Sequence, residues 1–209
     1  CMIYAKENRD VATIDIPNAF IQTVVEDSKD RVTIRIRGLM VDILTNIEPN
    51  MYGPYVTFDK RGNKQLLVEC LNAIYGTILA ILIYYIKFNT SLSKEGYRMN
   101  SYDPCVWNKM IDEKQMTICF HVDDCKLSHV SPKAIDKTIE WLRRDYESIF
   151  EDGSGKMTVH RGKRHTYLGM SIDFSEKRLV SILMEGYLSE VIAAWDKAVP
   201  LGEGFALVK

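Results

Sequence analysis

Alternating apolar and polar positions predict β-strands in the first third of the chain. Residues 11–21 (VATIDIPNAFI) begin with β-branched side chains and run into a Pro-Asn turn signal, so we expect a strand that carries Asp15 into a turn before a short helix. Residues 31–44 alternate between apolar and polar side chains, which predicts a strand with one face in water. From 46 to 62, the Asn, Pro and Gly residues indicate irregular chain.

The clearest alternation comes later, at 105–130. It predicts three strands, the first two joined by a turn at 112–114 and the last two by a tight turn at Asp123 and Asp124. Two adjacent carboxylates would then lie at the tip of a hairpin. Like charges at such a tip cost roughly 1–3 kcal/mol unless a cation lies between or beside them. The residues alone leave two interpretations open, a cation site or a solvated turn.

Helical spacing predicts three helices. The segment 64–97 begins as a short strand and becomes a long, mostly apolar helix that is buried and ends near Leu92. Residues 131–150 predict a second helix, with Ser131 as the N-cap and a proline at the first helical position. Beyond it we expect a loop, a strand hairpin and a closing helix over 186–199.

This order of elements predicts an α+β fold, in which an antiparallel sheet is backed by helices on one face; a doubly wound parallel sheet fits the order less well. The chain has 209 residues, 46% of them hydrophobic and 26% charged, and can therefore bury one substantial core. Its net charge of -1 gives no global attraction to nucleic acid, so binding of that kind would need local basic patches.

Cysteine usage and the apolar stretches bear on where the protein acts. Five scattered cysteines without a CxxC pair argue against a secreted disulfide framework, and no signal peptide opens the chain, so we expect an intracellular protein. The charge-free stretch 70–86 is shorter than the roughly 20 apolar residues of a spanning helix, so we expect no membrane partner. Because the first residue is Cys1, we expect a piece of a longer protein.

The paired carboxylates suggest a particular chemistry. Mg²⁺ prefers oxygen ligands and takes one or two carboxylates together with substrate phosphates. Asp15 also follows an apolar strand, so two neighbouring strands could present Asp15, Asp123 and Asp124 at one edge of a sheet. Two metal ions held by three such carboxylates would activate a 3′-hydroxyl and stabilise a pyrophosphate leaving group. That is the chemistry of a polymerase.

Several stretches, in this order, resemble motifs of the reverse transcriptase of Ty1/copia-type LTR retrotransposons. TIDIPNAFIQ resembles its first catalytic motif and FHVDD its Tyr-Val-Asp-Asp box. LNAIYGTILAILIYY is similar to its Leu-Tyr-Gly-Leu-Lys-Gln segment, GYRMNSYDPCVW to the stretch before the catalytic hairpin, and HTYLGMSIDF to its Leu-Gly motif. The resemblance covers nearly the whole chain and implies an RNA-directed DNA polymerase.

The resemblance also implies a domain organisation. It places a polymerase palm over 1–180, with a ferredoxin-like antiparallel sheet and a residual fingers insertion over about 22–66. The start of a thumb or connection would occupy 181–209. The implied partners are an RNA or DNA template, a primer and dNTPs, and the chain would belong to a longer polyprotein. It would act in the cytoplasm, within a virus-like particle, or in the nucleus.

The resemblance implies roles for individual residues. The implied catalytic residues are Asp15, Asp123 and Asp124, which with the backbone carbonyl of Ile16 would hold two Mg²⁺ ions, or Mn²⁺ as a substitute. The implied nucleotide-binding residues are Phe20, which would exclude a ribose 2′-hydroxyl, Gly76 and Val122. The implied primer- and template-binding residues are His121, Lys156, Arg161, Lys163, Arg164, Leu168 and Gly169. For the basic ones, a solvated hairpin tip is the alternative.

Departures from the family pattern keep other functions open. His121 stands where the family has Tyr, and Ile78, Leu79 and Leu82 stand where it has Lys, Gln and Arg. A truncated or degenerate element that folds without polymerising is therefore one alternative. A non-enzymatic binding module, in which the acidic turn only closes a hairpin, is another.

Three further groups of residues have other interpretations. Cys119, His121, Cys125 and His129 could be offered as a zinc set, but their spacing is not that of a zinc finger, and core packing is the preferred interpretation. Tyr75, Tyr84 and Tyr85 are interpreted as packing aromatics. Arg31, Arg35 and Arg37 could follow a template backbone or pair with nearby carboxylates.

Overall fold

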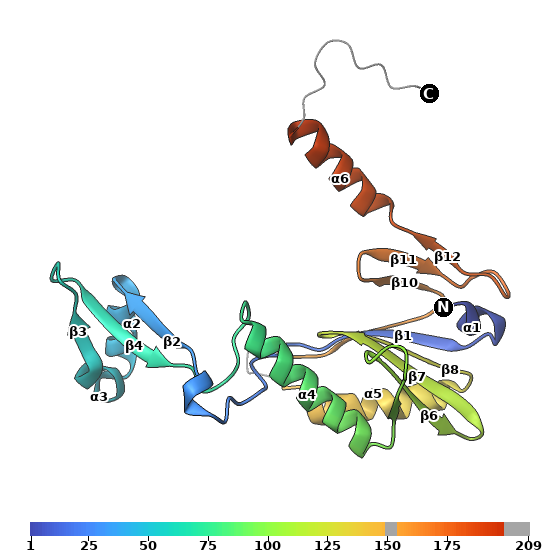
Figure 1. Cartoon of the computed structure of the whole chain (residues 1–209), viewed down its shortest axis with the longest axis horizontal. Coiled ribbons are helices and arrows are strands. Elements are labelled where there is room, and N and C mark those ends of the chain that lie inside the picture. Colours follow the sequence, from blue (N-terminus) through green and yellow to red (C-terminus); the bar gives the residue numbers. More distant parts are fainter. Residues whose placement is uncertain (149–153, 199–209) are drawn as a thin grey trace, which may run out of the picture. The chain divides into compact units, whose positions relative to one another are not determined.

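The computed structural model describes residues 1–148 and 154–198, and it divides into two compact units (Figure 1). The first unit is built from Cys1–Pro17 together with the chain from Leu92 onward. The second unit, Asn18–Ser91, is inserted between these two parts.

The main sheet of the first unit has six antiparallel strands in the order β5-β6-β7-β8-β1-β9. They are β5 (Arg98–Met99), β6 (Val106–Ile111), β7 (Lys114–His121), β8 (Asp124–His129), β1 (Asp10–Asp15) and β9 (Thr158–Arg161). The strands of the predicted 105–130 segment are thereby confirmed, as is the end of the first strand at Asp15. Asp112 and Glu113 both have positive φ, as a two-residue type I′ turn requires between β6 and β7.

The two-residue period of the strands gives this sheet two different faces. One face carries apolar side chains such as Ile14, Ile118 and Leu127, all at most 2% exposed, and α5 (Pro132–Tyr146) packs against β8 and β1. The helix α5 confirms the helix predicted over 131–150 as far as Tyr146, where it ends because Glu147 has an extended backbone; the Ser131 side chain makes no capping hydrogen bond, and residues 149 and 150 lie outside the described residues.

The opposite face is covered by α1 (Met2–Lys6) and by a second antiparallel sheet. Its strands are β10 (Arg164–Tyr167), β11 (Met170–Asp173) and β12 (Ser181–Leu183), and α6 (Glu185–Ala198) follows. Tyr4, Val11, Tyr167, Ile172 and Phe174 form one apolar cluster there. The strand hairpin and the closing helix expected after 150 are therefore confirmed.

The inserted unit contains a three-stranded antiparallel sheet in the order β2-β4-β3. Its elements are β2 (Thr33–Arg37), α2 (Leu39–Ile47), α3 (Pro49–Tyr52), β3 (Val56–Phe58), β4 (Lys64–Glu69) and the start of α4 (Ile78–Lys94). Short 3₁₀ turns, η1 (Ser28–Asp30) and η2 (Gly53–Tyr55), lie between them. Val41 of α2 and Leu66 of β4 are both buried, and α2 packs against β2 and β4.

Three expectations for this region were wrong. The strand predicted over 31–44 stops at Arg37, because Gly38 has a φ of +63° and the apolar residues after it follow helical spacing. The segment 46–62 is not irregular throughout, since β3 pairs there with β4. The long helix is not buried on all sides, because Ile78 and Leu82 are 88% and 52% exposed.

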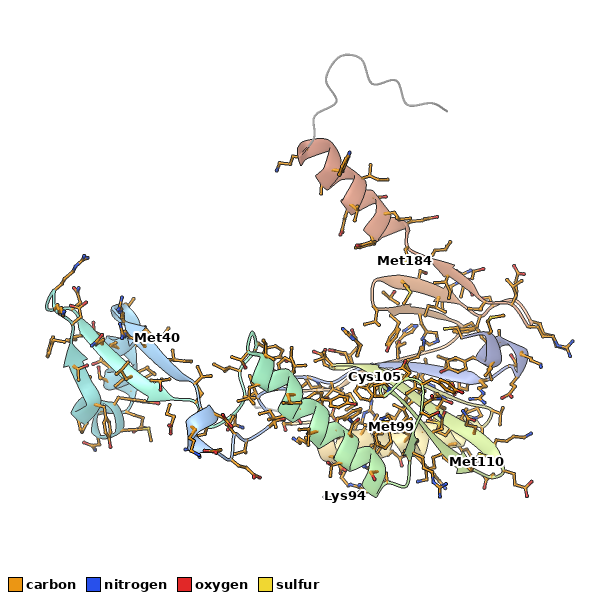
Figure 2. The ribbon with its side chains drawn as sticks, in the orientation of Figure 1. Met40, Lys94, Met99, Cys105, Met110 and Met184 are labelled. Carbon is orange, nitrogen blue, oxygen red and sulfur yellow. The ribbon has the colours of Figure 1, made fainter. Side chains whose placement is uncertain are left out.

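Exposed apolar side chains occur on both units. Figure 2 labels Met40 of α2 and Met110 of β6, which are 53% and 65% exposed. Among the described residues, no helix combines the length and the apolar character needed to cross a bilayer. Taken together, the described residues form a mixed α+β structure with antiparallel sheets and helices.

Candidate active site

Asp15 and Asp124 are direct cross-strand partners, at the end of β1 and the start of β8. Residues directly opposite each other in an antiparallel pair point to the same face, with Cβ atoms about 4.5–5.5 Å apart. The backbone N–H of Ile16 donates a hydrogen bond of 3.0 Å to the carbonyl oxygen of Asp123, which fixes the chain after β1 against the turn. The structure thus brings Asp15 next to the consecutive pair Asp123 and Asp124, from which it is far apart in the sequence.

The turn that carries Asp123 has unfavourable backbone geometry. His121 and Asp124 form the last pair of the β7–β8 hairpin, so Val122 and Asp123 are its two central residues. Val122 has a φ of +56° and Asp123 does not have a positive φ, the pattern of a type II′ turn, which favours glycine at the first central position. A β-branched residue in that conformation is strained by about 1–2 kcal/mol.

Replacing Val122 with glycine should therefore stabilise the protein. We expect Val122→Gly to raise the free energy of unfolding by about 1 kcal/mol, because the relief of left-handed strain exceeds the entropy that glycine adds to the unfolded chain. Urea denaturation followed by circular dichroism measures the change. Val122→Ala, which keeps a Cβ, should give no such gain, and a loss of stability in Val122→Gly would show that this turn stores no strain.

The carboxylates of the turn are not neutralised by cations. Burial raises the pKa of Asp15, and repulsion from Asp123 raises it further. Burial also raises the pKa of Asp124, with added repulsion from Asp123 and Asp15 and a small opposing attraction from His121. Within residues 1–148 and 154–198, no lysine or arginine forms an ion pair with any of these three aspartates. A bound cation would relieve this repulsion.

The donor chemistry suits a hard divalent cation, but the ligands are not gathered around one point. Asp15 and Asp124 face each other, and Asp123 supplies a third carboxylate on the adjoining turn. Across the described parts of the chain, however, no group of three or more His, Cys, Asp or Glu side chains is arranged to hold a metal ion. The zinc alternative is also disfavoured, because Cys119 and Cys125 point to opposite faces of the sheet.

Two of the predicted nucleotide-binding residues belong to the inserted unit. Phe20 is 6% exposed, and its ring centroid lies 4.7 Å from that of Tyr75 and 5.9 Å from that of Tyr84, so it is part of an aromatic cluster. The short helix expected after the Pro17-Asn18 turn does not form: residues 17–22 are turns, and Asn18 has a φ of +54°, in the left-handed region that a right-handed helix does not use. Gly76 has a φ of +89° with open space around it, so its conformation requires glycine.

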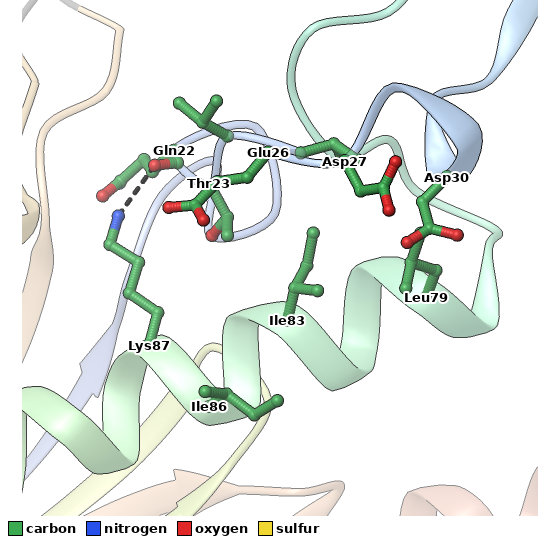
Figure 3. Close-up of a pocket in the computed structure, with 11 residues that line it drawn as sticks. Gln22, Thr23, Glu26, Asp27, Asp30, Leu79, Ile83, Ile86 and Lys87 are labelled. Atoms are coloured by element: carbon green, nitrogen blue, oxygen red, sulfur yellow. Dashed lines mark hydrogen bonds between the residues drawn. The ribbon is translucent and has the colours of Figure 1, made fainter.

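The apolar departures from the family pattern lie on α4. Leu79, Ile83 and Ile86 line a cavity of about 550 Å³, whose opposite wall includes Glu26 and Asp27 (Figure 3). Lys87 lies at one end and donates a hydrogen bond of 2.7 Å to the carbonyl oxygen of Gln22 (Figure 3). Ile78 and Leu82 instead point into solvent. Ile78, Leu79 and Leu82 are apolar and therefore do not offer the polar contacts that the resemblance would require at these positions.

The predicted primer and template residues fall into two groups. Leu168 and Gly169 form the turn between β10 and β11, with φ angles of +51° and +74°, and Leu168 is partly exposed. His121 and Lys156 are exposed as well. These four are accessible to a ligand.

The remaining basic residues of that stretch make contacts within the protein. Arg161 forms ion pairs with Asp10 and with Asp136, the latter at 2.5 Å. Arg164 pairs with Asp173 at 2.8 Å, and Lys163 donates a hydrogen bond to Asn8. These contacts favour a structural role for Arg161, which joins β9 to β1 and α5.

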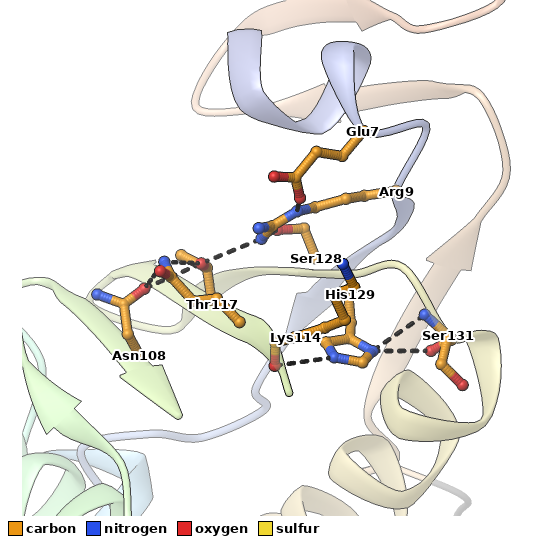
Figure 4. A network of polar contacts seen from close by, with 9 residues as sticks. Glu7, Arg9, Asn108, Lys114, Thr117, Ser128, His129 and Ser131 are labelled. Carbon is orange, nitrogen blue, oxygen red and sulfur yellow. Dashed lines mark hydrogen bonds and ion pairs between the residues drawn. The ribbon is translucent and has the colours of Figure 1, made fainter. Parts of the chain in front are cut away.

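Sequence reasoning did not single out two buried cations of the first unit, Arg9 and Lys126. Arg9 is 5% exposed; it pairs with Glu7 at 2.8 Å and donates to the hydroxyls of Thr117 and Ser128 at 3.4 Å (Figure 4). Lys126 is 6% exposed, on the same strand and face as Asp124, with its Nζ 4.6 Å from the ring centroid of Tyr167. Burial lowers its pKa. The alternation in β8, Asp-Cys-Lys-Leu-Ser-His, was the signal that could have placed Lys126 on this face.

Comparisons with known proteins give a weak likeness. No protein-family model matches the chain, and no curated protein matches it either. Among solved structures, it is similar to apo telomerase from Candida Tropicalis, with 12% identity, a TM-score of 0.46 and coverage of 86% of this chain and 34% of that one. It is also similar to telomerase from Candida albicans in complex with a TWJ fragment of telomeric RNA, with 15% identity, a TM-score of 0.41 and coverage of 83% and 31%. The chain therefore spans about a third of the solved chains that it resembles, and no residue role is taken from them.

Proposed function

We propose that this chain carries the palm of an RNA-directed DNA polymerase of the Ty1/copia type, which adds dNTPs to the 3′-hydroxyl of a primer on an RNA or DNA template. One observation supports this most directly: Asp15 and Asp124 are register partners beside Asp123, in the arrangement that the two motif resemblances require. The six-stranded sheet of the first unit would be the palm. The residual fingers, expected over about 22–66, would lie within the inserted unit, and the protein would act inside the cell as part of a longer polyprotein.

In this proposal the three aspartates and the carbonyl of Ile16 would hold two Mg²⁺ ions. When bound, such ions activate the primer hydroxyl and stabilise the charge of the leaving pyrophosphate. The protein's own contribution is to keep the carboxylates in place. Ile16 does so through its hydrogen bond to Asp123, and the rigid ladder between β1 and β8 holds Asp15 opposite Asp124.

The raised pKa of Asp124 predicts a pH-dependent stability. The pKa of Asp124 in the folded protein lies above its usual value of 3.8. The protonated carboxyl therefore contributes stability that is fully present below pH 3.8, and this stability is lost as the pH rises through the pKa of the folded protein. Without metal, Asp124→Asn is therefore expected to raise the melting temperature at pH 7 by about 1–3 °C, and to leave it unchanged below pH 3.8. Thermal denaturation in EDTA at both pH values measures the difference.

Adding Mg²⁺ to the same samples tests the cation site itself. At pH 7 the metal should raise the melting temperature of the wild type and have little effect on Asp124→Asn, because binding to the folded state alone stabilises it. Glu113→Gln, which removes an exposed carboxylate in the β6–β7 turn, is the matched control and should respond like the wild type. Equal responses of wild type and Asp124→Asn would argue against metal binding at this turn.

A folded element without polymerase activity is the second candidate. It is favoured by the lack of a gathered ligand set in the described residues and by the apolar side chains on α4. Primer extension with purified protein, a primed template, dNTPs and Mg²⁺ separates the two. Incorporation that depends on Asp123 supports the polymerase, whereas Mg²⁺ binding without incorporation supports the inactive element.

A further inference from the structure

The cavity between α4 and the segment 22–30 has two chemically different walls (Figure 3). On α4, the wall is apolar and consists of Leu79, Ile83 and Ile86. The segment 22–30 contributes three carboxylates, which belong to Glu26, Asp27 and Asp30. All the lining residues fall within Asn18–Ser91, so the cavity lies entirely within the inserted unit. Its volume of about 550 Å³ is within the roughly 300–1,000 Å³ of small-molecule pockets.

Two of the three carboxylates are not neutralised by the protein. Asp27 pairs with Lys29 at 3.7 Å, a long contact between two exposed side chains. Glu26 and Asp30 form no ion pair within the parts of the chain that the structure describes. Their negative charge is therefore available to a ligand.

Of the described residues that line the cavity, only Lys87 is basic. It follows Leu79 by eight residues on α4, which places it about 12 Å further along the helix. Its Nζ donates a hydrogen bond to the carbonyl oxygen of Gln22, and burial lowers its pKa. Figure 3 shows Lys87 at the end of the cavity opposite Asp30. With three acidic residues and one basic residue, the cavity has an excess of negative charge.

The cavity also contains a buried hydroxyl without a partner. Thr23 is 7% exposed, and its backbone is held on both sides: its N–H donates to the carbonyl oxygen of Phe20, and its own carbonyl oxygen accepts from the N–H of Ala73, both at 2.9 Å. Its side-chain Oγ1 is buried as well and has no hydrogen-bond partner. Because an unpaired buried hydroxyl is unfavourable, a ligand that donates a hydrogen bond to Thr23 would gain from it.

The wall opposite α4 is held in place without a ligand. The N–H of Val25 donates to the carbonyl oxygen of Leu71 at 2.8 Å, and the carbonyl oxygen of Val25 accepts from Arg31 at 3.2 Å. The side-chain amide of Asn72 donates to the carbonyl oxygen of Ile21 at 2.6 Å. A site that is already ordered loses less conformational freedom when a ligand binds.

We propose that this cavity binds a small organic ammonium ion with an apolar body. The apolar body packs on Leu79, Ile83 and Ile86, and the ammonium group donates to Thr23 Oγ1 and to a carboxylate of the segment 22–30. An ammonium group has three N–H donors and a positive charge, so it can satisfy the hydroxyl and offset the carboxylates at once. The proposal does not rest on the polymerase function, because the cavity includes none of the three aspartates of the acidic turn.

A ligand-observed NMR titration of the whole chain with 4-phenylbutylammonium tests the site. For a ligand of this size we expect a Kd on the order of 1 mM. The uncharged 4-phenylbutanol should bind at least about fivefold more weakly, and the anionic 4-phenylbutyrate more weakly still. High salt should weaken the binding of the ammonium ion and leave that of the alcohol unchanged.

Thr23→Val removes the hydroxyl and nearly keeps the shape of the side chain. It should weaken the binding of 4-phenylbutylammonium by about tenfold, because a hydrogen bond to a charged group is lost. It should also raise the melting temperature of the ligand-free protein, because the unpaired hydroxyl is gone. Thr23→Ser keeps the hydroxyl and should bind within about twofold of the wild type. If Thr23 had a structural role only, Thr23→Val would change the melting temperature and leave the affinity unchanged.

Glu26→Gln/Asp30→Asn tests the carboxylates and should weaken binding by about fivefold. Glu48→Gln removes an exposed carboxylate of the same unit outside the cavity and should bind like the wild type. Asp123→Asn should also bind the ammonium ion as the wild type does, even if it has lost all primer extension. Equal binding of 4-phenylbutanol and 4-phenylbutylammonium, or wild-type affinity in Thr23→Val and in the double variant, would overturn the proposal.

Discussion

Asp123→Asn and Asp124→Asn are each expected to lower Mg²⁺-dependent primer extension by at least about 10³-fold. A single positioned hydrogen-bond donor in an active site is worth 10²–10³ in rate, and a carboxylate that directly binds a catalytic metal should contribute at least as much. Asp15→Asn should have a similar effect, because Asp15 is the register partner of Asp124. The rate of incorporation on a primed template, with dNTPs and Mg²⁺ in excess, measures these losses.

The control for this experiment has to keep the fold and change only charge. Glu140→Gln removes one exposed carboxylate from α5, an element other than the turn, and should keep full activity. Each Asn variant should also show wild-type circular dichroism, since none removes an ion pair or a buried apolar group. If Asp123→Asn and Asp124→Asn retain most of the activity, the acidic turn is not the catalytic centre.

Leu127→Ala is expected to reduce the free energy of unfolding by about 2–5 kcal/mol. Leu127 is fully buried on β8, between β7 and β1, so truncation leaves a cavity in the middle of the main sheet in addition to the lost apolar burial. Such a loss is a large fraction of the total stability of an ordinary domain. Equilibrium urea denaturation of the whole chain gives the value.

A matched surface variant separates burial from side-chain size. Met110→Ala removes a similar volume from β6, but Met110 is 65% exposed (Figure 2), and the change should stay within about 0.5 kcal/mol. A loss in Leu127→Ala as small as that in Met110→Ala would mean that the main sheet is not the cooperative core of the first unit.

The predictable parts of the structure were those determined by local pattern. The hairpin around Asp123 and Asp124 followed from strict alternation, and α5 followed from helical spacing with a proline at its start. The meeting of Asp15 with Asp124 could be inferred because Asp15 ends one apolar strand and the turn with Asp123 and Asp124 directly follows another. Whether the carboxylates bind metal could not be inferred, since that depends on side-chain orientations that neither alternation nor spacing determines.

The parts that failed depend on partners remote in the sequence. Residues 39–44 follow an alternating strand and were interpreted as its continuation, but Gly38 ends the strand and packing against β2 and β4 favours the helix Leu39–Ile47. Arg161 looked available for phosphate because its own neighbourhood is basic, yet its two acidic partners come from β1 and α5.

The position of β1 between β8 and β9 has a consequence for synthesis on the ribosome. The two strands that pair with β1, β8 and β9, both begin more than a hundred residues after β1 in the sequence. When β1 leaves the ribosome, the backbone N–H and C=O groups on both of its edges therefore have no strand to pair with. At 5–20 residues per second, it waits roughly 5–20 s before β8 is even complete. Nascent chains stalled before residue 124 should therefore be the form that chaperones bind most strongly, and the opposed aspartates can come into contact only after that delay.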